Sequence, residues 1–324
     1  MKLGQALYRG FHQTAALLNK VDPNLILSST KNKVTTLTMN DPKKLNGWTG
    51  PMMKTLRDRF VQHAADPNTK VLILTGADPY YCAGVNLGNT IQPMHPKKLH
   101  TMIKTNNHAI FDAFLDFPKP ILIAANGPAI GACVTSASTC DAILASEKAT
   151  FLVPFARLSI PPEGCSSVHF ERMLGKEPAG KMLAEGWKPS AAEAKEIGLV
   201  IDVVPHDQLM VKAQELAEQW VAAGKVKEIP AGGSVEEYKA VNARESLELA
   251  DAFLFYPFLD VSKCKLQPCW PFRLQSTQLY NSFKKKSKNL QFSLYQVPRQ
   301  KAQRQKAQQT IGLADTRPSR LLAQ

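Results

Sequence analysis

The chain has 324 residues, 44% of them hydrophobic and 21% charged, a composition typical of globular proteins that bury a full core. No apolar run reaches the roughly 18 residues of a membrane-crossing helix, so we expect no membrane span. The net charge of +13 is concentrated near the C-terminal end, because residues 261–324 hold 13 Lys or Arg and a single acid, Asp315. The rest of the chain is nearly neutral, and no nucleic acid is expected as its partner.

The C-terminal segment, residues 256–324, is rich in lysine and glutamine and has little apolar surface to bury. We therefore expect a poorly ordered basic tail. Two interpretations of this tail stay open. It contacts nucleic acid or an anionic membrane surface, or it is a solvated extension without a partner. A run of like charges is more often of the second kind.

The cysteines do not predict a metal site. No pair shows the C-x-x-C spacing of zinc sites, and without a secretory signal we expect reduced thiols. The six are Cys82, Cys133, Cys140, Cys165, Cys264 and Cys269.

Strand and helix patterns alternate through residues 1–260, within which we take 24–255 as one domain behind an extension at 1–23. Strands are predicted at 24–30, 34–40, 71–76, 121–127, 142–146 and 199–204. A helix is predicted from Pro51 onward, with others at 97–115, 131–139, 163–174, 178–186, 190–197 and 206–223. Strands separated by helices indicate an α/β fold with parallel pairing.

A first break rich in small residues, YYCAGVNLG at 80–88, follows the strand predicted at 71–76. Ala83 and Gly84 allow a sharp turn that exposes the amide of Val85. Packing alone also favours small residues in such turns, so the break by itself has two interpretations.

A second break, NGPAIGACVTS at 126–136, follows the strand predicted at 121–127. Gly131 and Ala132 give a tight entry into a helix whose first amides point outward. Neither break matches a P-loop or a dinucleotide-binding fingerprint.

Glu163 is a lone carboxylate in an apolar and small-residue run, PPEGCSS at 161–167. Desolvation raises the pKa of a buried carboxyl group, which suits a general base that takes a proton from carbon. The alternative is structural, because a Glu at the start of a helix also complements the helix dipole and caps free amides. The local sequence leaves both interpretations open.

Taken together, these segments resemble the crotonase superfamily of enoyl-CoA hydratases and isomerases over about residues 24–255. The resemblance implies a crotonase-like superhelix of ββα units with a C-terminal helical region. It also implies that the amides of Val85 and Ala132 form an oxyanion hole for the thioester of an acyl-CoA substrate, where two donors can contribute several kcal/mol. By the same resemblance, substrate contacts fall on Cys82, Ala83, Gly84, Asn86, Leu87, Gly131 and Phe155. Close relatives generally carry Asp where Asn86 stands.

Hydratases of this family use two glutamates, and the matching positions here hold Thr135 and Phe155, so hydration is not expected. The stretch FLVPFARLSIPPEGCSS at 151–167 instead resembles the peroxisomal-type Δ3,Δ2-enoyl-CoA isomerases, whose single catalytic glutamate corresponds to Glu163. The implied reaction is a 1,3-proton shuttle in which Glu163 takes a proton from C2 of a 3-enoyl-CoA and returns it at C4. No cofactor is expected, since coenzyme A is part of the substrate.

Other residues receive weaker assignments. We assign His169 and Asp141 to structure, because a lone His on an apolar face is more often structural than catalytic. Lys97 and Lys98 have charges that suit the phosphates of coenzyme A, although exposed lysines more often only solvate a surface.

The rival function is a catalytically silent crotonase-like domain that binds CoA or proteins, as in the chromodomain-linked relatives. The intact Glu163 favours the enzyme, whereas the fading of the resemblance after residues 241–253 favours the rival. Thioester hydrolysis or dienoyl isomerisation would need a second acid at Thr135 or Phe155.

The family resemblance also implies a homotrimer. For location, the peroxisome and the mitochondrial matrix stay open. An SRL tripeptide at 319–321 is not terminal, and the first 21 residues carry basic groups without an acid, which suits a mitochondrial presequence or an ordinary leading helix.

Overall fold

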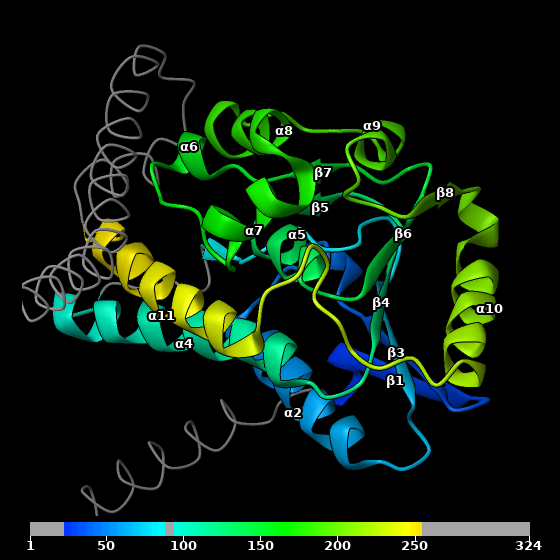
Figure 1. Ribbon diagram of the computed structural model, residues 1–324. Coiled ribbons are helices and arrows are strands. Elements are labelled where there is room, and N and C mark those ends of the chain that lie inside the picture. The colour runs from blue at the N-terminus through cyan, green and yellow to red at the C-terminus, as the bar shows by residue number, and fades with distance from the viewer. Residues whose placement is uncertain (1–22, 88–93, 255–324) are drawn as a thin grey trace, which may run out of the picture. The chain divides into compact units, whose positions relative to one another are not determined.

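The computed structural model describes residues 23–87 and 94–254 (Figure 1). The described residues leave out most of the predicted extension and the whole predicted tail at 256–324, which includes Cys264 and Cys269. The domain boundaries therefore stay predictions.

A six-stranded sheet has the order β1-β2-β3-β4-β6-β8. A tight turn at Asn32 and Lys33, with φ of 52° and 65°, joins β1 and β2 as an antiparallel hairpin, since both residues adopt the left-handed conformation that such turns require. The other pairs in this sheet are parallel, as the alternating pattern predicts. The strands are β1 Ile26–Lys31, β2 Val34–Met39, β3 Val71–Gly76, β4 Ile121–Ala125, β6 Ala142–Ser146 and β8 Asp202–Val204.

A second sheet pairs two short strands, β5 Ala129–Ile130 and β7 Phe151–Leu152, in parallel. The helices are α2 Gly50–Ala65, α4 Pro96–Asp116, α5 Ala132–Ser138, α6 Phe155–Leu158, α7 Ser166–Leu174, α8 Lys176–Gly180, α9 Ala191–Glu196, α10 Leu209–Ala222 and α11 Val235–Ala252. Short turns of 3-10 helix lie at Pro23–Leu25, Pro42–Lys44 and His206–Gln208, and a π-helical turn lies at Lys181–Glu185.

Three predicted elements differ from the structure. The helix predicted at 163–174 begins only at Ser166, because Gly164 and Cys165 adopt left-handed φ values of 66° and 67° that a helix cannot contain. Of the strand predicted at 199–204, only β8 at Asp202–Val204 forms. The amides of Leu199 and Val200 instead donate to the Ala194 carbonyl and close the end of α9. The helix predicted at 178–186 divides into α8 and the π-helical turn.

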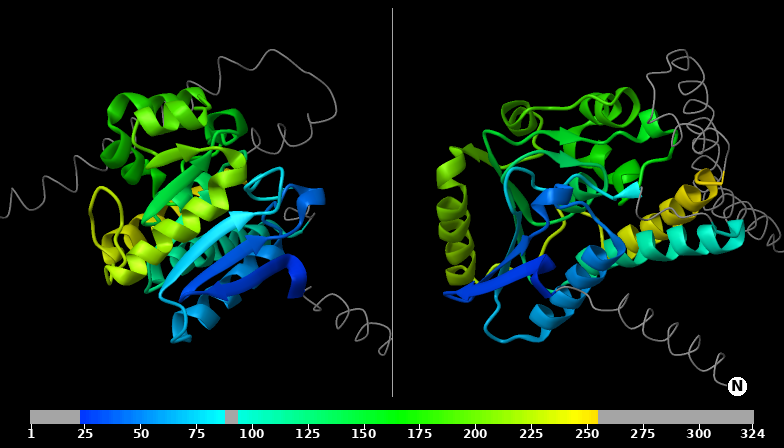
Figure 2. Two further views of the ribbon diagram at one scale, coloured as in Figure 1. Left: turned by 90° about the vertical axis from the view of Figure 1, so that its right-hand side faces the viewer. Right: turned by 180° about the vertical axis from the view of Figure 1, so that it is seen from behind.

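The sheet carries helices on both faces. On one face Leu209, Ala213 and Ala217 of α10 pack against Ile73 and Leu122 of the sheet. The larger core lies on the other face, where α2, α4 and α5 bury aromatic and aliphatic side chains around Trp48. Figure 2 shows α10 on the opposite side of the sheet from α2 and α4.

The longest described helices, α4 and α11, lie side by side (Figure 1). Polar contacts, the Lys239–Asp116 ion pair among them, join the two helices. The Asn107 amide donates to Ser246 Oγ at 3.1 Å, and the Asn242 amide donates to the His108 carbonyl at 3.0 Å and to Asp112 at 2.8 Å. Buried polar pairs of this kind specify one helix register, which holds α11 in place over α4.

Replacing Phe114 tests the larger core. Its ring is 1% exposed, stacks on Trp48 at 6.0 Å between centroids and meets Phe60 edge-on at 4.9 Å. Phe114→Ala should lower the free energy of unfolding by about 3–5 kcal/mol in urea titrations, because it leaves a cavity. Val61→Ala on α2, where the side chain is 73% exposed, should change stability by less than about 0.5 kcal/mol. Equal effects would contradict this account of the core.

Candidate active site

The two breaks predicted from the sequence lie next to each other, one after β3 and the other after β4. The Ile130 amide donates to the Cys82 carbonyl at 3.0 Å, and the Cys82 amide donates to the Pro128 carbonyl at 3.3 Å. The Cys133 thiol adds a bond to the same Cys82 carbonyl at 3.0 Å. Adjacent parallel strands thus bring together two segments that are about 45 residues apart in the chain.

Each break needs its glycine. Gly84 has φ of 78°, and a Cβ there would lie 2.3 Å from the Ile130 carbonyl oxygen, so only glycine permits the loops to approach this closely. Gly131, with φ of 67°, is the N-cap residue of α5. The predicted turns are therefore present at both positions.

The amides of Val85 and Ala132 differ from their neighbours in hydrogen bonding. Neither N–H donates a hydrogen bond to any described residue, whereas the flanking amides are engaged: Asn86 donates to the Trp48 carbonyl at 3.0 Å and Gly131 to the Leu152 carbonyl at 2.7 Å. Ala132 is the first residue of α5, whose amide has no acceptor within the helix. Two such donors on adjoining loops can bind an oxygen on which negative charge develops.

Asn126 ties the two loops together, and the sequence reasoning did not single it out. Its Oδ1 accepts the Gly76 amide at 3.1 Å at the end of β3, and its Nδ2 donates to Asp78 at 2.8 Å. The side chain is 5% exposed. An asparagine at the very end of a buried strand, followed by glycine, was the signal that could have identified it.

Glu163 lies in the turn before α7 rather than on the helix, and its side chain is 5% exposed. Within the described ranges no donor reaches its carboxylate. Burial, through which the carboxylate loses its water, and then the negative charge of Glu245 together raise the pKa of Glu163 to about 8.

The structural alternative for Glu163 is wrong in one respect: its side chain does not cap α7. The N-cap residue is Cys165, which provides no side-chain bond, and the carboxylate that accepts the Cys165 and Ser167 amides belongs to Glu245 on α11. Glu163 contributes only its backbone carbonyl, which accepts the Ser166 amide and hydroxyl. Sequence reasoning missed Glu245, because nothing local marks its helix as a neighbour of Glu163.

The turn after Glu163 packs on the first turn of α5. A Cβ at Gly164 would lie 2.3 Å from the Phe111 ring and 2.5 Å from Thr135 Oγ1. The Thr135 hydroxyl in turn donates to the Ala132 carbonyl at 3.1 Å. The backbone beside Glu163 therefore lies against the same helical turn that presents the Ala132 amide.

The other predicted contact residues fall into two groups. Cys82, Ala83, Gly84, Asn86 and Leu87 belong to the first loop, which adjoins Gly131 of the second. Phe155, on α6, is 2% exposed and belongs to the larger core. Substrate contacts at these residues stay predictions.

His169 and Asp141 have structural bonds, as the sequence indicated. His169 Nε2 donates to the Ser138 carbonyl at 2.7 Å and Nδ1 bonds the Tyr238 hydroxyl at 2.8 Å, so neither ring nitrogen is free for proton transfer. Asp141 accepts the amides of Ile121 and Glu228, both at 2.8 Å.

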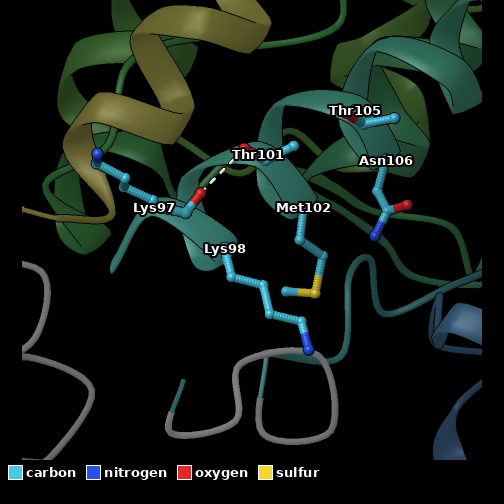
Figure 3. Close-up of a pocket in the computed structure, with 6 residues that line it drawn as sticks. All are labelled: Lys97, Lys98, Thr101, Met102, Thr105 and Asn106. Carbon is cyan, nitrogen blue, oxygen red and sulfur yellow. Dashed lines mark hydrogen bonds between the residues drawn. The ribbon is translucent and has the colours of Figure 1, made fainter. Parts of the chain in front are cut away.

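Lys97 and Lys98 lie at a hollow of about 570 Å³ along the first turns of α4, which Figure 3 shows with Thr101, Met102, Thr105 and Asn106. The two lysine side chains extend in different directions, and Thr101 donates to the Lys97 carbonyl at 2.9 Å. A second hollow adjoins Asp141 and residues 227–235. Glu163 lines neither hollow.

In the part of the chain that the structure describes, no group of three His, Cys, Asp or Glu residues is placed to hold a metal ion. Cys82, Cys133, Cys140 and Cys165 are free, buried thiols. Among the described helices, none is both long and apolar enough to cross a membrane.

Gly164 offers a test of the turn that holds Glu163. Gly164→Ala places a methyl group at φ of 66° against Phe111 and Thr135, and should lower the free energy of unfolding by about 2–5 kcal/mol from backbone strain and overpacking. Gly180→Ala, on α8 with open space around the position, should be neutral or stabilising by up to about 1 kcal/mol. Urea titration measures both, and a Gly164→Ala protein as stable as wild type would contradict the packing described here.

Comparisons with known proteins agree with this architecture. The model of the enoyl-CoA hydratase/isomerase family matches residues 29–263. The mouse protein named enoyl-CoA delta isomerase 3, peroxisomal, is 34% identical over 184 residues, which are 56% of this chain and 57% of that protein. The mouse chromodomain Y-like protein 2 is 35% identical over 178 residues, 53% of this chain and 35% of its own length. The chain thus aligns with little more than half of the first of these relatives, and with about a third of the second.

Among solved structures, an enoyl-CoA hydratase/isomerase from Pseudoalteromonas atlantica T6c superposes with a TM-score of 0.67 at 25% identity, covering 76% of this chain and 98% of that one. The family match covers well over half of the chain. The chain therefore belongs to the enoyl-CoA hydratase/isomerase family of the crotonase superfamily, and its α/β architecture is the crotonase fold.

Proposed function

We propose that this protein is a Δ3,Δ2-enoyl-CoA isomerase, which converts a 3-enoyl-CoA to the 2-trans isomer. The observation that carries the proposal is the state of Glu163: a buried carboxylate with raised pKa and, among the described residues, no hydrogen-bond donor. In its ionised form such a carboxylate is a stronger base than an exposed glutamate. Its turn packs on the helix that presents the free Ala132 amide.

The chemistry follows from these groups. Glu163 removes a proton from C2, and the negative charge that develops on the thioester oxygen is stabilised by the amides of Val85 and Ala132. The protonated Glu163 then returns the proton at C4, so the double bond moves by one position. One carboxylate is sufficient, because C2 and C4 lie on one face of the extended allyl unit.

Hydration is disfavoured, because adding water requires a second group to activate it. Thr135 is fully buried and its hydroxyl donates to the Ala132 carbonyl, and Phe155 has no titratable group. The nearby Glu245 already accepts two backbone amides with its two oxygens, so it is not free to serve as this base.

The remaining features of the proposal follow from the family and the proposed chemistry. The substrate is an acyl-CoA, the reaction needs no cofactor beyond the coenzyme A of the substrate, and the protein assembles as a homotrimer. The similarity to a relative named peroxisomal makes the peroxisome a candidate location beside the mitochondrial matrix.

A second candidate is a catalytically silent domain that binds CoA or other proteins. The similarity to chromodomain Y-like protein 2 favours it. The two candidates differ in whether the bound acyl-CoA is isomerised.

Glu163→Gln tests the enzyme directly. The substitution keeps the shape of the side chain and removes the base, so kcat for conversion of 3-enoyl-CoA to the conjugated 2-enoyl-CoA should fall at least roughly 100-fold, with acyl-CoA binding retained. Glu171→Gln, on the exposed side of α7, is the matched control and should leave kcat unchanged. A wild-type protein that binds acyl-CoA without isomerising it would support the silent domain instead.

The raised pKa of Glu163 also predicts a pH dependence of stability. The ordinary pKa of a glutamate side chain is 4.5, whereas the pKa of Glu163 in the folded protein is about 8, so between these values the folded state holds a proton that the unfolded chain has released. The free energy of unfolding should therefore fall as pH rises through this window, by up to roughly 1.4 kcal/mol per pH unit from this group. Urea titrations should show a shallower fall for Glu163→Gln, and parallel curves for the two proteins would contradict the raised pKa.

A further inference from the structure

Glu245 connects α11 to the turn that carries Glu163. One of its carboxylate oxygens accepts the Cys165 amide at 2.6 Å, and the other accepts the Ser167 amide at 3.0 Å. These are the second and fourth residues after Glu163, and the contact spans about 80 positions of the chain. Two charge-assisted bonds from one side chain fix both the position and the orientation of this backbone.

The turn needs such a support. Gly164 and Cys165 both adopt the left-handed conformation, which a non-glycine residue such as Cys165 rarely adopts unless its surroundings hold it there. The Cys165 thiol adds one more bond to α11, to the Tyr238 carbonyl at 3.3 Å. Besides these contacts, the turn is held by its packing against Phe111 and Thr135 and by the Ser166 amide and hydroxyl, which donate to the Glu163 carbonyl.

Glu245 is itself held firmly. Its side chain is fully buried, and its neighbours on α11 bond to α4 through the contacts of Asn242 and Ser246. The position of the carboxylate is therefore set by the pairing of two long helices rather than by a loop. A group on paired helices is a more rigid support than one on a loop.

Glu245 also acts on Glu163 through its charge. After burial, its negative charge is the second cause that raises the pKa of Glu163. The pKa of Glu245 is itself raised to about 7 by burial, against the lowering effect of the Ser167 side chain, of the two amides and of Arg244. Asp112 on α4, which bonds Asn242, is a further charged group near this turn.

We propose that Glu245 is the positioning residue for Glu163: its two oxygens hold the left-handed turn that carries the Glu163 side chain, and its carboxylate places a second negative charge beside that turn. This inference rests on the proposed isomerase function for its kinetic consequences. The structural part concerns two carboxylates of one folded chain and is testable without turnover.

Two substitutions separate the roles of position and charge. Glu245→Gln keeps the length of the side chain but removes the charge and presents a donor to one of the two amides. Glu245→Asp keeps the charge but is too short to reach both amides. Glu248→Gln, one turn further along α11 and partly exposed, is the matched control.

The expected kinetic results differ between these variants. Both Glu245 variants should lose at least roughly ten-fold in kcat with little change in KM, because the base is misplaced while binding is retained. In Glu245→Gln the acid limb of the kcat/KM profile should move to lower pH, since a like charge has been removed. In Glu245→Asp this limb should stay closer to that of wild type, and Glu248→Gln should match wild type in both measurements. A folded Glu245→Gln protein with unchanged kcat, or with an acid limb at the wild-type pH, would overturn the proposal.

A double-mutant cycle in unfolding free energy tests the charge without an assay of turnover. Wild type, Glu163→Gln, Glu245→Gln and the double variant are unfolded in urea at a pH where both glutamates are ionised. Glu245→Gln should cost less stability when Glu163 is present than in the Glu163→Gln background, because only in the first case does it relieve repulsion. Equal costs would overturn the proposal. An inactive wild type would instead overturn the isomerase function and leave the outcome of this cycle unaffected.

Discussion

The site depends on one buried carboxylate, that of Glu163. None of the residues that the structure describes donates a hydrogen bond to it. Placing Glu163 in this environment opposes folding in its charged form, and the surrounding structure must compensate. The same desolvation makes the carboxylate a stronger base than an exposed glutamate. The loss of stability and the gain in base strength therefore have one physical cause. Sites of this kind are where local structural rules and function conflict most often.

The compensation comes from elements far away in the sequence. The larger core around Trp48 and Phe114 fixes α4, α4 fixes α11, and α11 places Glu245 against the turn at Gly164 and Cys165. Each link is either well-packed apolar surface or a fully bonded polar pair. A strained turn can persist in such surroundings because they leave it no alternative conformation.

The two loops that contain Val85 and Ala132 depend on a different set of contacts. Parallel pairing of β3 and β4 places their carboxyl ends side by side, and Asn126 bonds the end of one strand to the loop of the other. Gly84 then permits a backbone approach that any side chain would prevent. The amides of Val85 and Ala132, which donate to no described residue, take their positions from this backbone geometry and not from the chemistry of their own side chains.

The sequence by itself determined the alternation of strands and helices, the two small-residue turns and the presence of one isolated carboxylate at position 163. These are local properties, because periodicity and glycine placement act over a few residues. Only the tertiary structure decided that Glu163 precedes α7 instead of capping it, and that Glu245 binds the Cys165 and Ser167 amides. It also decided that Leu199 and Val200 close the end of α9 instead of continuing a strand. Those outcomes depend on which distant helix packs against a segment, and a one-dimensional pattern does not encode the partner of a contact that spans about 80 residues.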